Sequence, residues 1–547
     1  MKNTIKLLCV SSATLLLTTG CNFIIGGNSE NTTSSNDVTS QTNSETTSSV
    51  MSSSSEDDGV IKYAGQQITL ELVGENNGVV YTGATGDQNI VVVPVMFNDI
   101  TLTELQTAKN NYDWEVDYSS ESAIKENIRK TFFGESNETG WESVASYMKK
   151  SSYGKLNLTG EVTDVFTYNK SFKNFLDATD TSDYSDYFDP TWDVTEAAKD
   201  WVKSKYTDYN ERFDKDEDGY IDGIWLVYLT PFYSADSAES FYKSQLGVSN
   251  SNYTKKYEEK VQNTMWAYVY WNYRSSAITF PDFDPYVYGW ASYSFAFEGY
   301  GESALDAHTF IHETGHMLGL DDYYNYSGSD SPLGGIDMHD ANIGDDNAYS
   351  KYLLNWVTPQ IVNKKGTYTL KPFESTGETF LIPAGNFNDS PYDEYLLLEY
   401  YTPTGLNEKD SSGYPGNDYS TFSTNGLKIL HVDSRLAKMN SSTDEFIEYS
   451  DTFYQYSDDY YSVLGHSNTP NYNVAENDTS RLITLISARE PSSNNYYYTD
   501  VDSASDSDLF TKGKSVPSSY KFHDGSSLGF KITVTNVSDE GVTITLE

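Results

Sequence analysis

Two kinds of hydrophobic periodicity alternate along this chain. Apolar runs at 90–99 and 224–229, and an alternating stretch at 156–162, predict strands. Pro94 raises a reservation about a central place for the first, because proline donates no backbone hydrogen bond. Helical spacing marks 121–150 and 193–205, and short strand-like runs recur at 368–370, 395–400, 427–433, 530–537 and 542–546. The pattern predicts an α+β fold, with a mixed domain over 59–360 and a β-rich C-terminal module over 361–547.

A further helix is predicted near residues 307–318, where polar and apolar positions separate by face. One stripe of roughly 100° holds the apolar positions, which are Ala307, Phe310, Ile311, Thr314 and Leu318. The opposite stripe holds His308, His312, Gly315 and His316. Gly319 can end the helix, because glycine reaches the left-handed conformation at low cost. Such a helix has an apolar back and a histidine front.

The histidine front carries the motif H-E-x-x-H-x-x-G-x-x-D, from His312 to Asp322. His312 and His316 lie one turn apart, so both can bind one Zn²⁺, and Asp322 can return after the turn as the third ligand. A fourth position stays open for water, which is typical of a catalytic zinc site. Glu313 is the candidate catalytic base, taking a proton from the water on zinc.

Two neighbouring residues offer alternatives to this assignment. His308 also lies four residues before His312, but Thr309 would then stand at the base position and cannot act as a carboxylate. We therefore expect His308 to line the cleft, to support the ligands or to be purely structural. Asp321 competes with Asp322 as the third ligand, and the spacing favours Asp322.

An acidic loop at 214–222 predicts a second metal site. It has carboxylates at alternate positions, a glycine at the sixth and an apolar residue at the eighth, as calcium loops do. Trp225 stands where such a loop has its bidentate glutamate, so Asp222 or a residue elsewhere must complete the shell. We expect structural Ca²⁺ here, with candidate ligands Asp214, Asp216, Asp218, Tyr220 and Asp222. The alternative is a solvated acidic turn.

The N-terminal residues predict export. A basic start and an apolar stretch at 7–17 precede Cys21, which is typical of a secretory signal too short to span a bilayer stably. The site resembles the lipobox of bacterial lipoproteins, although Thr18 stands where that pattern prefers a branched aliphatic residue. We expect a lipoprotein signal at 1–20, lipid on Cys21 that anchors the chain to a membrane, and a disordered Ser/Thr/Asn-rich tether at 21–58. Secretion without lipid is the alternative.

Composition limits the kinds of partner that the chain is expected to bind. The formal net charge of -44 argues against nucleic-acid binding and favours solubility and cation binding. The two cysteines are Cys9 and Cys21, so the mature chain would have no disulfide.

Several of these motifs, in this order, resemble the immune inhibitor A family of secreted bacterial zinc metallopeptidases. The resemblance covers roughly residues 88–440 and includes segments at 131–134, 151–156, 214–222, 308–322, 348–356 and 426–433. It implies a metzincin-like fold, zinc on His312, His316 and Asp322, Glu313 as base, and calcium at Asp214, Asp216 and Asp218. It also implies a Met-turn, a methionine floor beneath the zinc. Family members often carry methionine where this chain has His339, so either Met338 or His339 provides that floor.

The predicted function is an extracellular zinc endopeptidase that hydrolyses protein or peptide substrates, anchored as a monomer at a bacterial cell surface. The alternative, from a different class, is a non-catalytic surface lipoprotein that binds host or matrix polymers on a protease-like scaffold. A protein that no longer catalyses a reaction could have lost the base or a zinc ligand. This sequence retains the base and all the zinc ligands of the motif.

Overall fold

The computed structural model describes residues 62–178, 189–232, 241–245, 260–261, 264–271, 285–326, 331–414, 420–440, 446–449, 460–463, 465–469, 481–489 and 504–547. The predicted signal, Cys21 and the tether lie outside these residues. No described helix is long and apolar enough to cross a membrane. The described chain contains helices and several sheets, as an α+β fold requires.

The first half of the chain is built on a six-stranded sheet. Its strands are β1 (Gly86–Phe97), β2 (Leu156–Val162), β3 (Phe166–Tyr168), β4 (Ile224–Tyr228), β5 (Tyr268–Trp271) and β6 (Val287–Ser292). They lie in the order β2-β1-β4-β6-β5, and β3 also pairs with β1. All pairs are parallel except β5 with β6. The strands predicted at 90–99, 156–162 and 224–229 are confirmed as β1, β2 and β4.

Pro94 lies in β1, near the middle of this sheet. The sequence raised a reservation about such a central place for a strand that contains proline. On one side β1 pairs with β2 as far as Val92 and then with β3 from Val95 onward. Pro94 lies in the gap between these two neighbours, where that edge has no ladder partner to lose. A central strand therefore tolerates proline at this point.

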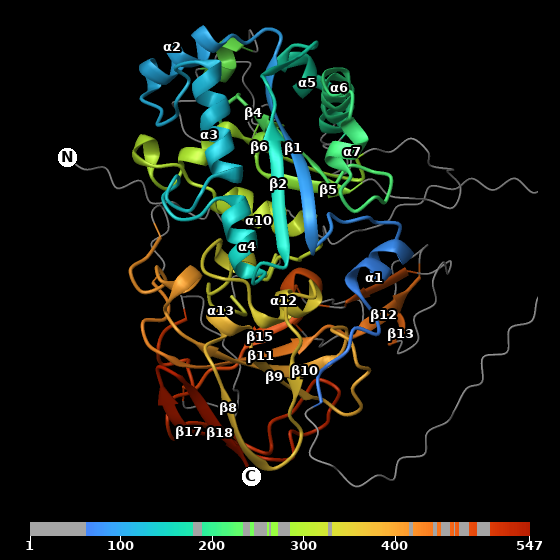
Figure 1. Ribbon diagram of the computed structural model, residues 1–547, viewed down its shortest axis with the longest axis vertical. Helices are drawn as coiled ribbons and strands as arrows, with labels where there is room; N and C mark the ends of the chain where they lie inside the picture. The colour runs from blue at the N-terminus through green and yellow to red at the C-terminus, as the bar shows by residue number, and fades with distance from the viewer. Residues whose placement is uncertain are drawn as a thin grey trace, which may run out of the picture.

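Helices cover both faces of the sheet (Figure 1). Trp225 of β4 packs against Phe132 of α3 (Glu121–Phe133) and Phe310 of α10 (His308–Met317), with ring centroids 5.3 and 5.7 Å apart. Tyr228 points to the opposite face, where it packs against Phe175 of α5 (Phe172–Ala178). Other helices flank the sheet: α1 (Leu70–Asn76), α2 (Leu102–Tyr112), α4 (Val144–Ser151), α6 (Asp189–Lys205) and α7 (Tyr209–Phe213).

The helical spacing at 121–150 belongs to two helices, α3 and α4. The first ends at Gly134, and Ser143 caps the second by accepting a hydrogen bond from the backbone N–H of Ser146. A cap of this kind starts a new helix and does not continue the old one. The helix predicted at 193–205 is confirmed as part of α6.

From Gln360 onward the regular elements of the described chain are mostly strands. A five-stranded sheet contains β7 (Gln360–Ile361), β9 (Thr379–Pro383), β10 (Glu394–Tyr401), β11 (Gly426–Asp433) and β15 (Ile483–Leu485). A four-stranded sheet contains β8 (Gly366–Leu370), β16 (Ser515–Val516), β17 (Ile532–Ser538) and β18 (Gly541–Leu546). A third sheet contains β12 (Leu436–Met439), β13 (Phe446–Tyr449) and β14 (Tyr460–Val463).

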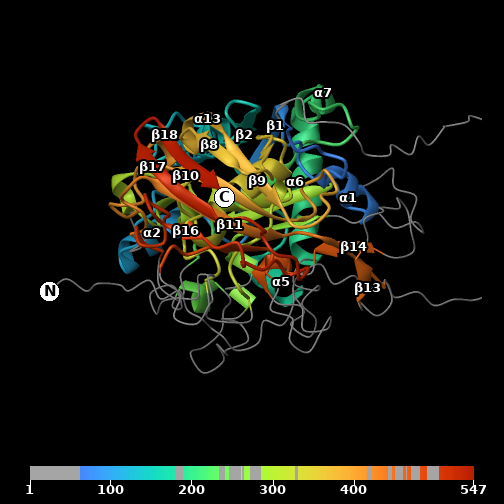
Figure 2. The ribbon, with the colours of Figure 1, turned by 90° about the horizontal axis from the view of Figure 1, so that it is seen from below.

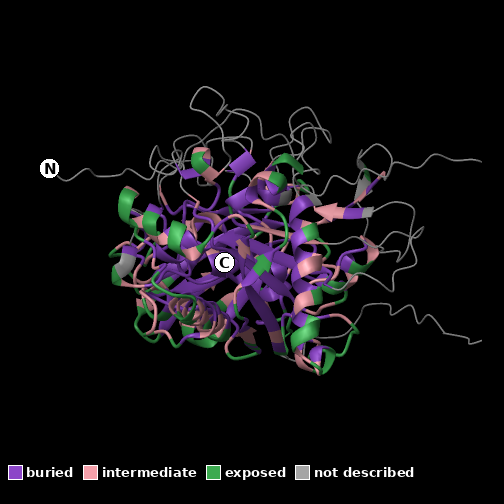
Figure 3. Ribbon diagram, turned by 90° about the horizontal axis from the view of Figure 1, so that it is seen from above, coloured by how far each residue is buried: buried purple, intermediate pink, exposed green. Residues whose placement is uncertain are grey.

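The five-stranded sheet joins the two parts of the molecule. On β10, Tyr395 and Leu397 belong to the large core shared with the first half, whereas Leu396 and Leu398 belong to a second core with β8, β17 and β18. Seen from below, these C-terminal strands lie over one end of the helical half (Figure 2). Buried residues fill the strands at the centre of the molecule, and exposed ones collect on the outer helices (Figure 3). The short helices α11 (Met338–Ala341), α12 (Ala348–Leu353) and α13 (Phe373–Thr376) lie between these parts.

Candidate metal centre

The helix that carries the motif is α10, and its packing fixes which face looks inward. The predicted apolar stripe is buried, at Ala307, Phe310, Ile311, Thr314 and Leu318. Gly319 follows the helix with φ +98°, a left-handed conformation that glycine adopts most readily. The helix end therefore turns the chain back, as the sequence predicted, and brings residues 320–322 towards the histidines.

Three donor atoms converge in front of α10. Nε2 of His312 and Nε2 of His316 lie 3.1 Å apart. Oδ1 of Asp322 lies 3.0 Å from the first and 3.3 Å from the second. A tetrahedral ion with ligands at roughly 2.0–2.1 Å has ligands about 3.3 Å from one another. The triangle therefore has the size that a zinc-like ion requires.

Hydrogen bonds on the far side of each ring show that these donors present lone pairs. Nδ1 of His312 contacts the carbonyl oxygen of Met338 at 2.9 Å, and Nδ1 of His316 contacts that of Leu320 at 2.7 Å. A carbonyl oxygen only accepts, so each Nδ1 carries the proton, and the neutral ring keeps its lone pair on Nε2. Oδ1 of Asp322 is buried and has no hydrogen-bond partner. Three lone pairs facing one another require a cation, or protons in its place.

The electrostatics of the site agree with this geometry. Burial lowers the pKa of His316, but Asp322 and Glu313 outweigh it and raise the pKa to about 10. Burial raises the pKa of Asp322, but the two histidines bring it well below its usual range. The protein therefore favours positive charge at the point where the three donors meet.

Asp322, and not its neighbour Asp321, is the carboxylate that reaches both histidines. Its other oxygen, Oδ2, accepts a hydrogen bond from the Tyr326 hydroxyl. This bond orients Oδ1 towards the histidines, as supporting groups do behind metal ligands. Tyr326 was not predicted as part of the site, and its position four residues after Asp322 is the only signal for it in the sequence.

The ring beneath the two histidines belongs to His339. Its centroid lies 4.9 Å from that of His312 and 5.1 Å from that of His316. Burial and the two neighbouring histidines hold the pKa of His339 well below its usual value, so the ring is neutral. Met338 contributes its carbonyl oxygen to His312. The two residues between which the sequence left the floor open thus both contact the site, one by its ring and the other by its backbone.

Glu313 is buried beside the same histidines. Burial raises the pKa of its carboxyl group, and His316 and His312 partly offset the rise. A carboxylate with a raised pKa is a better proton acceptor. His308 is turned elsewhere: its ring stacks on Trp141 at 4.9 Å, and its Nδ1 lies 2.5 Å from Oδ1 of Asp306. At the start of α10, His308 therefore contacts Trp141 and Asp306.

The acidic loop brings Asp214, Asp216 and Asp218 together, with one oxygen from each within 4.8 Å of the others. Gly219, at φ +96°, donates its backbone N–H to Oδ2 of Asp214, whose Oδ1 is buried without a hydrogen-bond partner. These three carboxylates could hold a cation. Asp222 instead accepts backbone N–H groups of Lys215 at 2.9 Å and Asn89 at 2.5 Å, so it pins the loop to β1.

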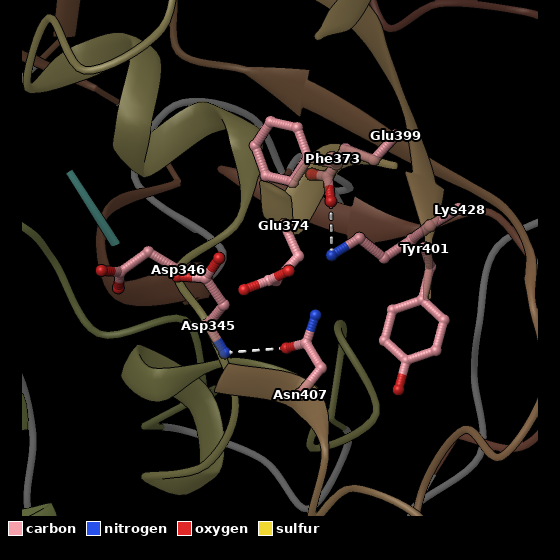
Figure 4. Close-up of a pocket in the computed structure, with 8 residues that line it drawn as sticks. All are labelled: Asp345, Asp346, Phe373, Glu374, Glu399, Tyr401, Asn407 and Lys428. Atoms are coloured by element: carbon pink, nitrogen blue, oxygen red, sulfur yellow. Dashed lines mark hydrogen bonds and ion pairs between the residues drawn. The ribbon is translucent and has the colours of Figure 1, made fainter. Parts of the chain in front are cut away.

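A polar pocket is lined by residues just before α12, on α13, and on β10 and β11 of the five-stranded sheet (Figure 4). Two of its carboxylates pair with lysines: Lys428 Nζ lies 2.6 Å from Oε2 of Glu399, and Lys351 Nζ lies 2.6 Å from Oδ2 of Asp345. Oδ1 of Asp346 lies 3.9 Å from Nε2 of His339, which connects the pocket to the metal centre. Each ion pair lies within one half of the molecule, and hydrogen bonds cross between the halves: Ala348 N–H donates to Oε1 of Glu399 at 2.7 Å, and Asp345 N–H donates to Oδ1 of Asn407 at 3.0 Å.

No protein-family model matches the chain, and no curated protein matches it.

Proposed function

We propose that the chain is a zinc-dependent endopeptidase of metzincin-like architecture, as its resemblance to the immune inhibitor A family implies. One observation carries the proposal: three lone-pair donors, from His312, His316 and Asp322, lie 3.0–3.3 Å apart, with a buried glutamate beside them. Two imidazoles and one carboxylate are a donor set that suits zinc and leaves a position for water. Calcium would prefer oxygen ligands, so it fits the acidic loop and not this centre.

Each residue then has a distinct task. A zinc ion held there would polarise both a water molecule and the substrate carbonyl group. Nδ1 of His312 and Nδ1 of His316 donate to the carbonyl oxygens of Met338 and Leu320, so Nε2 of each ring is the atom that would bind the ion. Glu313 accepts a proton from the attacking water and can pass it to the leaving amine. Tyr326 holds Asp322, and the His339 ring packs beneath the two histidines.

Glu313→Gln tests this function directly. The amide keeps the shape of the side chain but cannot accept the proton, so kcat/KM on a generic protein substrate should fall by roughly 10²–10⁴-fold. Zinc content should stay unchanged. Asp321→Asn is the matched control, because it neutralises a neighbouring carboxylate outside the donor triangle. Wild-type activity of Glu313→Gln would contradict the assignment of the base, and full activity after complete zinc removal would contradict the enzyme class.

For the place where the enzyme acts, we keep the prediction from the sequence, which is a lipid-anchored enzyme. With Cys21 as anchor, a flexible chain of about 37 residues has a root-mean-square reach of roughly 30–37 Å. The enzyme would then cleave proteins close to the cell surface. Mass spectrometry of the mature N-terminus tests this: lipid on Cys21 supports the anchor, whereas an unmodified start at another residue means a secreted enzyme.

A further inference from the structure

A second group of metal-binding side chains lies in the C-terminal part, far along the chain from the first. Glu394 begins β10, His431 lies in β11, and His523 lies in the loop between β16 and β17. One ligand atom from each lies within 4.8 Å of the others. We call these three residues the C-terminal histidine cluster.

The sheet register shows why these residues meet. Glu394 is paired with Asp433, and His431 is paired with Leu396, at one end of the β10–β11 ladder. Paired residues of an antiparallel ladder point to the same face, so all four lie on the face that carries Leu398 and Ile429 into the second core. Glu394 and His431 are each only 1% exposed. A buried carboxylate on an apolar sheet face, directly opposite a second carboxylate, needs positive charge nearby.

The contacts of the cluster resemble those behind metal-binding histidines. Nε2 of His431 lies 2.9 Å from Oε1 of Glu394, while its Nδ1 lies 2.8 Å from the hydroxyl of Tyr520. Nδ1 of His523 lies 2.9 Å from Oδ2 of Asp433. A ring held on one nitrogen by a hydroxyl or carboxylate is oriented to offer the other to a metal.

Asp433 is itself held by Arg435, whose Nε and Nη2 lie 2.7 and 2.8 Å from its two oxygens. The arginine therefore neutralises Asp433. It lies 3.8 Å from Oε2 of Glu394, a longer separation. Glu394 itself accepts the backbone N–H groups of His523 on Oε1 and of Asp524 on Oε2, so the carboxylate holds the loop that carries His523 beside the two imidazoles.

We propose that Glu394, His431 and His523 bind a second transition-metal ion, of the zinc class, with a solvent molecule as the fourth ligand and the task of holding a loop to the sheet. Two nitrogens and one oxygen suit zinc and do not suit calcium or magnesium. The side chain of His523 is 19% exposed, so an ion can enter from that side.

The ion would fasten one loop to the five-stranded sheet. Residues 517–529 fold back on themselves through bonds such as Leu528 N–H to the carbonyl of Tyr520 and Gly529 N–H to that of Ser518. Tyr520 and Phe522 of this loop belong to the second core. A metal shared by the loop and β10–β11 therefore closes the two sheets over that core, in a region of the chain that contains no cysteine.

Zinc stoichiometry of the mature chain tests the proposal. The wild type should bind two zinc ions, and His312→Gln with His316→Gln should leave one. His431→Gln with His523→Gln should also leave one but keep peptidase activity, and the fourfold variant should bind none. Lys521→Gln, in the same loop, is the control and should still bind two.

His431 is buried, so its variant can misfold. His523→Gln alone, at a partly exposed position, provides the second measurement. In the His312→Gln/His316→Gln background, added zinc should raise the melting temperature, and His523→Gln should abolish that rise. A wild type that binds one zinc, lost only with His312 and His316, overturns this proposal and leaves the proposed function standing. A single zinc that depends only on His431 and His523 supports this proposal and contradicts the proposed function.

Discussion

A Cβ atom on Gly315 would lie 2.2 Å from Nε2 of His339. Gly315 is one of the two residues between Glu313 and His316, so the contact lies inside the metal-binding motif. The close approach of helix α10 to the His339 ring therefore requires a glycine. That ring is in turn placed beneath His312 and His316.

Gly315→Ala should destabilise the protein and weaken zinc binding. Alanine favours a helix by about 1 kcal/mol over glycine, but overpacking a rigid core typically costs about 1–3 kcal/mol. The neighbour is a fully buried ring, so the clash should win, and the free energy of unfolding should fall. Denaturant unfolding and zinc titration measure both effects. In Gly315→Ala/His339→Ala the clash is removed, so the two losses should be less than additive; simple additivity would contradict the contact.

Tyr326→Phe should lower zinc affinity by about 10–100-fold, the usual effect of removing a group that orients a metal ligand. The substitution removes only the hydroxyl that donates to Oδ2 of Asp322. Competition against a chromophoric chelator gives the affinity. Tyr323→Phe is the control, since that hydroxyl contacts Ser350 and not Asp322. Equal affinity in Tyr326→Phe and wild type would show that Asp322 needs no such support.

The residues in these two predictions differ in whether the sequence could predict their place in the site. His312, His316 and Asp322 were predictable because helix periodicity and one glycine turn place them within eleven residues. Tyr326 and the His339 ring depend on how a later segment folds back under α10, and no local period encodes that. The C-terminal histidine cluster is harder still, because its residues come from two strands and a loop spread over 130 positions.

In the fold, too, local patterns predicted some features, and others depend on contacts between distant segments. The apolar runs predicted β1 and β4 because a strand buried on both faces is apolar throughout, and the alternation at 156–162 predicted β2, which buries one face. The tolerance of Pro94 could not be predicted, since it depends on where β1 changes partner from β2 to β3. Nor did the residues near 395–400 indicate that β10 separates two cores, with Leu397 in one and Leu398 in the other.

Zinc binding should release protons and tighten as pH rises. In the metal-free protein the pKa of His316 is raised to about 10, so the ring is protonated at neutral pH and must lose that proton to bind zinc. Each released proton makes zinc Kd fall about tenfold per pH unit. The same proton stabilises the metal-free fold, fully below the unfolded pKa of about 6.5, and this contribution is lost as pH rises through about 10.

The zinc-induced increase in melting temperature should therefore grow between about pH 6 and pH 8. In this range the protons on His312 and His316 compete with zinc, and they compete less as pH rises. Differential scanning calorimetry with and without zinc measures it. Titration in buffers of different ionisation enthalpy counts the protons directly. An increase that is constant or shrinks with pH would contradict a protonated His316 in the metal-free state.

Calcium should stabilise the fold through the loop at 214–222. Asp214, Asp216 and Asp218 lie together, and the buried oxygen Oδ1 of Asp214 has no hydrogen-bond partner. A cation that binds only the folded state adds about 2.7 kcal/mol to the free energy of unfolding at one hundred times its Kd. The melting temperature should rise with free calcium, and Asp214→Ala with Asp216→Ala should abolish the rise. Glu217→Gln removes a carboxylate of the same loop outside the cluster, so its calcium response should persist. If the double alanine variant responds like wild type, calcium stabilises the protein at another site.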